Sequence, residues 1–164
     1  MSTAGPTQGA KAPSGGRTLH AVGERGGHVV LDTNIVLDLW VFDDPANASL
    51  RTALEDGALR WLATAAMREE LSRVLAYPQI VRRLTARDLP AQDVLARFDR
   101  YAQLQPEAPK APYTCKDADD QKFIDLAVHH GAALHSKDAQ VLCMKNRLAR
   151  CGVALNPSFL ETTA

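Results

Sequence analysis

Residues 28–34 read His-Val-Val-Leu-Asp-Thr-Asn, a short apolar run that ends abruptly in polar residues. Glycines before such a run and polar residues after it are typical of a buried strand. The next apolar stretch, residues 35–40, predicts a helix that Asp32 or Thr33 would cap. Asp32 therefore stands at the carboxyl end of a buried strand, where open α/β sheets form their binding crevices.

Strands and helices are expected to alternate along the rest of the chain. Further strands are expected at 59–63, 132–135 and 153–155. Helices are expected at 46–55, 64–76, 79–84, 91–104, 120–130 and 139–150. This alternation predicts an α/β fold in which helices cover both faces of a central parallel sheet.

Length and composition indicate a small intracellular protein. The 164 residues suit one ordinary domain, and a hydrophobic fraction of 46% is ample for a packed core. A formal net charge of zero argues against a polycation that coats nucleic acid non-specifically. The three cysteines lack CxxC spacing, and no apolar run is as long as a membrane span. We therefore expect a soluble cytoplasmic protein with no membrane partner.

Residues 1–27 are rich in Gly, Ala, Ser, Thr and Pro and lack periodic apolar positions. We expect them to form a flexible, mildly basic tail, which is either inert or an arm that touches a partner. The folded domain is expected at 28–160.

Several acidic side chains follow or flank the predicted strand ends. Asp32 and Asp138 each come after a strand, although each would also serve as the N-cap of the next helix. Asp120 opens a helix and projects on its apolar face. Its neighbours Asp117 and Asp119 are explained more simply as first-turn acids that the helix dipole favours. Because the carboxyl ends of parallel strands meet at one edge, Asp32, Asp120 and Asp138 are expected to converge.

A fourth acid is distinguished by helical phase. The apolar stripe of the helix at 64–76 consists of Met67, Leu71, Val74 and Leu75. At about 100° per residue, Glu70 borders this stripe, whereas Glu69 points directly away from it. Glu70 is therefore expected to face the sheet edge, with a snorkelling surface acid as the alternative.

Carboxylates gathered in one place repel one another unless a cation lies between them. A ligand set made only of oxygens suits Mg²⁺ or Mn²⁺ rather than Zn²⁺. Such an ion lowers the pKa of a bound water and neutralises charge on a phosphodiester. The predicted group of acids therefore favours metal-dependent phosphoryl transfer.

Four segments resemble the PIN-domain nuclease family, in particular its branch of toxins from toxin–antitoxin systems. They are residues 30–34, 70–75, 115–124 and 136–138, within a stretch from about 29 to 155. The resemblance implies a three-layer α/β/α sandwich with a central parallel sheet and a divalent-metal site that hydrolyses RNA. The chain departs from the branch at Ala118, where Pro is usual, and at Lys137, where a small residue is common.

The resemblance also implies roles for individual residues. Asp32, Glu70, Asp120 and Asp138 match the family's acidic quartet, as catalytic residues and as ligands of Mg²⁺ or Mn²⁺. The positions expected to support them are Asn34, Ser136, Asp117 and Asp119. Lys137, by contrast, departs from the family pattern, and we expect it to place a cation beside the substrate phosphate.

We therefore expect a divalent-metal-dependent endoribonuclease whose partners are RNA, an antitoxin protein if it is a toxin, and further copies of itself. One alternative is a catalytically silent module of the same fold that binds nucleic acid or protein. Another is an aspartate-nucleophile phosphatase, but that chemistry usually needs a second Asp two residues after the first. Asn34 stands there instead and cannot act as a general acid.

Overall fold

A computed structural model describes residues 27–158. Its centre is a four-stranded sheet in the order β3-β2-β1-β4, in which every pairing is parallel. The strands are β1 (His28–Leu31), β2 (Arg60–Ala63), β3 (Ala102–Leu104) and β4 (Ala133–His135). The parallel sheet predicted from the sequence is thus confirmed. The expected tail lies outside the described residues, except for residue 27.

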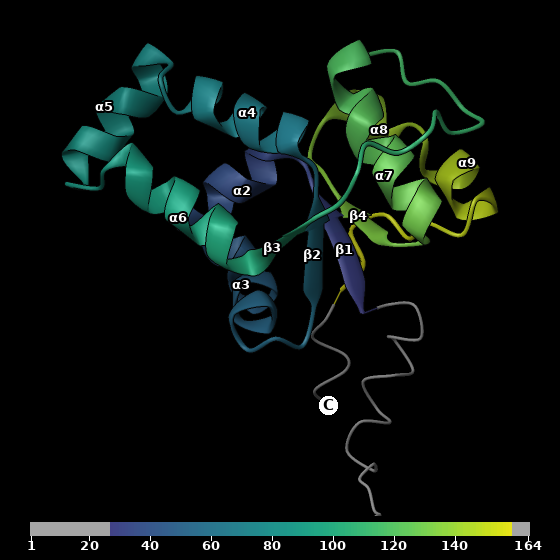
Figure 1. Cartoon of the computed structure of the whole chain (residues 1–164), viewed down its shortest axis with the longest axis horizontal. Coiled ribbons are helices and arrows are strands. Elements are labelled where there is room, and N and C mark those ends of the chain that lie inside the picture. Colours follow the sequence, from purple (N-terminus) through teal and green to yellow (C-terminus); the bar gives the residue numbers. More distant parts are fainter. Residues whose placement is uncertain (1–26, 159–164) are drawn as a thin grey trace, which may run out of the picture.

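Helices cover both faces of the sheet, as predicted (Figure 1). One side carries α2 (Thr33–Trp40), α3 (Ala48–Glu55), α4 (Ala65–Val74), α5 (Pro78–Ala86) and α6 (Ala91–Tyr101). The other side carries α7 (Gln121–His130), α8 (Ala139–Leu142) and α9 (Lys145–Arg150). Two 3₁₀ turns, η2 (Pro45–Asn47) and η3 (Ala118–Asp120), precede α3 and α7.

Aromatic rings pack the first helical layer against the sheet. The ring of Trp40 on α2 stacks on Trp61 of β2, with centroids 5.6 Å apart, and on Tyr101 of α6 at 6.0 Å. Phe98 meets the Trp61 ring edge-on at 4.9 Å. In the second layer, Ile124 of α7 is fully buried. Tight packing on both faces fixes the positions of the strand ends, and these carry the candidate site.

The structure corrects three of the predicted elements. The helix expected at 91–104 ends at Tyr101, and the next three residues form strand β3 beside β2. Two of these residues, Gln103 and Leu104, are exposed. The sequence therefore shows no alternation of apolar and polar residues here that would distinguish a strand from the end of a helix. The helix expected at 139–150 is divided between α8 and α9. The strand expected at 153–155 contributes only an isolated bridge between Leu155 and Leu134.

Candidate active site

Asp32 lies at the carboxyl end of β1 and is only 3% exposed. It caps α2, because its Oδ1 accepts the Ile35 N–H at 3.2 Å. Its backbone N–H donates to the His135 carbonyl of β4 at 3.1 Å. Its Oδ2 accepts a hydrogen bond from the Ser136 hydroxyl. Asp32 can therefore act as the N-cap of α2 and also belong to a site at the sheet edge. One of its oxygens caps the helix, and the other faces the loop after β4.

Ser136 connects Asp32 to Asp138. Its hydroxyl donates to Asp32 and accepts the Asp138 N–H at 3.1 Å. The Asn156 side chain makes two hydrogen bonds with the Ser136 backbone. Its Oδ1 accepts the Ser136 N–H at 2.9 Å, and its Nδ2 donates to the Ser136 carbonyl at 2.8 Å. The sequence analysis did not identify Asn156. The available signal was its Asn-Pro dipeptide, which is typical of a turn, and Asn156 does adopt a positive φ of 50°.

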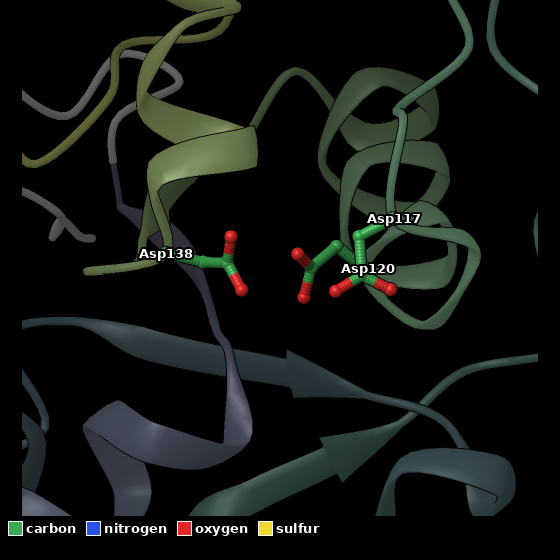
Figure 2. A group of neighbouring side chains, drawn as sticks. All are labelled: Asp117, Asp120 and Asp138. Carbon is green, nitrogen blue, oxygen red and sulfur yellow. The ribbon is translucent and has the colours of Figure 1, made fainter.

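Three carboxylates come together beside this network. One oxygen each from Asp117, Asp120 and Asp138 lies within 4.8 Å of the others. Asp117 and Asp120 come from the η3 region, and Asp138 faces them from the start of α8 (Figure 2). Asp117 was expected only as a supporting residue, yet it belongs to this group. We call these three residues the aspartate cluster.

Asp120 is the most perturbed member of the aspartate cluster. It is 8% exposed, and no donor in residues 27–158 hydrogen-bonds to its buried Oδ2. Burial raises its pKa to about 7, helped by the negative charge of Asp138 and by the hydrogen bond that protonated Asp120 makes to that residue. The charges of Asp117 and Asp32 act in the same direction. Without a cation, Asp120 is therefore partly protonated near neutral pH.

Burial also raises the pKa of Asp32, and the nearby charge of Asp138 adds to the effect. Hydrogen bonds from the Ser136 hydroxyl and from the Ile35 and Asn34 backbone N–H groups oppose this shift. Asn34, expected as a supporting residue, therefore acts on Asp32 through its backbone, since its side chain lies in an exposed position.

Glu70 lies at the edge of the site, on α4. The Thr33 hydroxyl donates to its Oε2 at 2.8 Å, and the Lys122 ammonium forms an ion pair with its Oε1. Its side chain is 19% exposed, whereas Glu69 is exposed. Glu70 is thus the more buried of the two acids, in agreement with the helical phase, and it contacts residues of α2 and α7. Glu70 does not belong to the aspartate cluster.

Two other predicted site residues have different partners from those expected. Asp119 is exposed, and its backbone N–H donates to Asp117 at 2.9 Å. The Lys137 ammonium lies 2.6 Å from Oδ2 of Asp38, a carboxylate that is only 4% exposed. The sequence analysis did not identify Asp38, although an acid inside the apolar run at 35–40 was a visible signal.

A pocket of about 410 Å³ opens on the Asp38 side of Ser136. Its lining includes Asp38, Asn47, His135, Lys137 and Asn156. Burial lowers the pKa of His135 to about 4, so its ring is neutral at physiological pH. A neutral, buried imidazole is unsuited to acid–base exchange near neutral pH.

The aspartate cluster has the features of a cation site. Its ligands are all oxygens, and no Lys or Arg within the described chain forms an ion pair with any of the three. The buried Oδ2 of Asp120 lacks a donor, which a divalent ion would replace. Hard oxygen ligands of this kind suit Mg²⁺ or Mn²⁺.

Among the helices of residues 27–158, none combines the length and apolar character needed to cross a membrane. Comparison with curated proteins gives no match to this chain. Residues 28–134, however, match the sequence model of the PIN domain. The matched range includes Asp32, Glu70, Asp117 and Asp120 and stops just before Ser136 and Asp138. Because this match covers most of the chain, the protein belongs to the PIN-domain family, whose members are generally nucleases.

Proposed function

We propose that this protein is a divalent-metal-dependent endoribonuclease that hydrolyses RNA phosphodiester bonds. The observation that carries the proposal is the aspartate cluster, in which buried Asp120 has an oxygen without a donor. Family membership supports a nuclease, and the resemblance to the toxin branch supports RNA as the substrate.

In this proposal Asp117, Asp120 and Asp138 hold a divalent ion, Mg²⁺ or Mn²⁺. When bound, the ion would neutralise charge on the phosphodiester and lower the pKa of a water. Asp32 and Ser136 keep Asp138 in place, since the Ser136 hydroxyl donates to the Asp32 carboxylate and accepts the backbone N–H of Asp138. Glu70 completes the acidic set from α4. Lys137 remains a candidate phosphate contact, although its ammonium pairs with Asp38 in this structure.

A cleavage assay with end-labelled RNA tests the proposal. Wild-type protein should cleave with Mg²⁺ or Mn²⁺ and lose activity with EDTA. Asp120→Asn should reduce cleavage by at least about 10²-fold, since it removes a group that holds the charge-stabilising ion. Asp32→Asn should do the same by disturbing the Ser136 contact that keeps Asp138 in place. Asp93→Asn, at an exposed position of α6, is the matched control and should retain activity. Equal cleavage by wild type and Asp120→Asn would exclude this mechanism.

We further propose that the protein is the toxin of a toxin–antitoxin system. This proposal includes a cytoplasmic location, binding to an antitoxin protein and self-association. A cytoplasmic location is compatible with Cys115, Cys143 and Cys151, all of which are free thiols here. Induced expression of the wild type should arrest growth, and a co-expressed antitoxin from a neighbouring gene should relieve the arrest. Arrest that persists undiminished in Asp120→Asn would point away from nuclease action.

A further inference from the structure

The Lys122 ammonium lies at the edge of the acidic site, where it forms an ion pair with Glu70. It also donates to the Asp119 carbonyl at 2.7 Å. Its charge lies 5.0 Å from the centre of the neighbouring Phe123 ring, and its side chain is 24% exposed. Three contacts, from α4, η3 and α7, therefore hold this cation in one place, unlike an ordinary surface lysine.

Both oxygens of Glu70 are already occupied. Lys122 binds Oε1, and the Thr33 hydroxyl donates to Oε2 at 2.8 Å. The protein itself therefore neutralises and orients this carboxylate before any ion binds.

These contacts join Glu70 to the backbone beside two other acids of the site. Thr33 directly follows Asp32, and the Asp119 carbonyl belongs to the peptide bond that leads into Asp120. Lys122 thus contacts both Glu70 on α4 and the backbone that leads into Asp120. A cation at this point neutralises the charge of Glu70.

Building on the proposed function, we propose that Lys122 takes the place of a second metal ion, so that the site binds a single divalent cation at the aspartate cluster. Two-metal nucleases use the second ion to neutralise the acids and the substrate charge on one side of the reaction. Here an ammonium already neutralises Glu70. Mg²⁺ gives up its water shell reluctantly, which disfavours its displacing a fixed ammonium from a carboxylate. Lys122 is in this sense a positioning residue for Glu70.

Mn²⁺ binding to the metal-free protein, without RNA, tests this proposal. Free Mn²⁺ can be followed by electron paramagnetic resonance during a titration at constant ionic strength. Wild type should bind one ion. Lys122→Met keeps most of the side-chain length but removes the charge, so it should bind a second ion, or bind the first at least about fivefold more tightly. RNA cleavage by the same variant should fall, because Glu70 loses its orientation. A variant that is merely destabilised would not gain metal affinity.

Three variants serve as controls. Lys116→Met removes an exposed ammonium next to Asp117 and should bind Mn²⁺ like the wild type. Lys122→Arg keeps the charge and should retain one-ion binding. The double variant Glu70→Gln/Lys122→Met removes both charges of the pair and should return to one ion of near wild-type affinity, which also covers the case in which Lys122→Met alone folds poorly.

Each outcome decides between the two proposals. Two ions bound by the wild type, or identical binding by Lys122→Met and Lys116→Met, would overturn the role of Lys122 while leaving the nuclease proposal intact. A wild-type protein that binds no divalent ion would overturn the proposed function itself.

Discussion

The Ser136 hydroxyl donates a hydrogen bond to Asp32 Oδ2, joining residues that are 104 positions apart in the sequence. The contact is possible because β1 and β4 are neighbours, with Leu31 paired to His135. The same hydroxyl accepts the Asp138 N–H at 3.1 Å. One buried serine therefore fixes the relative position of two of the acids proposed for the metal site.

Ser136→Ala should destabilise the protein and weaken metal binding. It leaves a buried carboxylate oxygen of Asp32 without its donor, which costs about 1–3 kcal/mol in the free energy of unfolding. Because the same hydroxyl accepts the Asp138 N–H, its loss should also loosen Asp138 and reduce Mn²⁺ affinity. The lost hydrogen bond is one that lowers the pKa of Asp32, so that pKa should rise further. Urea denaturation and Mn²⁺ titration measure both effects. Ser72→Ala, at an exposed position on α4, should change neither.

Asp120 should make a contribution to the stability of the metal-free protein that becomes less favourable as the pH rises towards 7, and Asp120→Asn should remove that contribution. The pKa of Asp120 is about 7 in the folded state against an ordinary value of 3.8. Between these values the folded protein binds more protons than the unfolded chain, so the free energy of unfolding falls with rising pH. Asn carries no charge at this position and should stabilise the protein at pH 8 by about 0.5–2 kcal/mol.

Urea denaturation of the wild type and of Asp120→Asn in EDTA at pH 5 to 8 tests this prediction. The quantity compared is the difference between their free energies of unfolding at each pH. The difference is needed because His135 contributes with the opposite sign. Its pKa falls from 6.5 to about 4 on folding, so its contribution to stability rises with pH across that window. Parallel pH profiles of the two proteins would contradict the raised pKa of Asp120. Added Mg²⁺ should restore stability to the wild type only.

Glu70→Gln and Glu69→Gln form a matched pair on one helix. Glu70→Gln weakens the contacts with Lys122 and Thr33 and should reduce RNA cleavage by about 10²-fold. Glu69 is exposed, so Glu69→Gln should cleave within about twofold of the wild type. The readout is the single-turnover rate at saturating Mg²⁺. Comparable losses in the two variants would mean that general charge, rather than the position of Glu70, determines the rate.

Lys137→Met should destabilise the protein by about 1–3 kcal/mol, because it removes the ammonium from a buried carboxylate of Asp38. Thermal or urea unfolding measures the loss. Asp38→Asn/Lys137→Met should recover part of it, since the double variant leaves no uncompensated charge. A raised KM for RNA with unchanged stability would instead support the phosphate contact expected from the sequence.

The sequence predicted the elements that have a strong periodic pattern. The strand that begins at His28 and the helices expected at 64–76 and 120–130 all agree with the structure to within two residues. Strand β3 could not be predicted in the same way, because Gln103 and Leu104 are exposed and carry no alternating pattern. Pairing with the edge of β2 makes them a strand, and that pairing involves residues about 40 positions apart.

Local sequence determined the parallel α/β arrangement that directs strand ends to one edge, and it predicted the acids of the site, with Glu70 chosen over Glu69. These features depend on periodicity along one element, which the sequence displays directly. Tertiary structure alone decided that Asp117 joins Asp120 and Asp138, that Lys122 neutralises Glu70, and that Lys137 pairs with buried Asp38. Each of these depends on which charge from a distant segment lies nearest in a partly desolvated space, where electrostatic interactions are strong and local patterns carry no information.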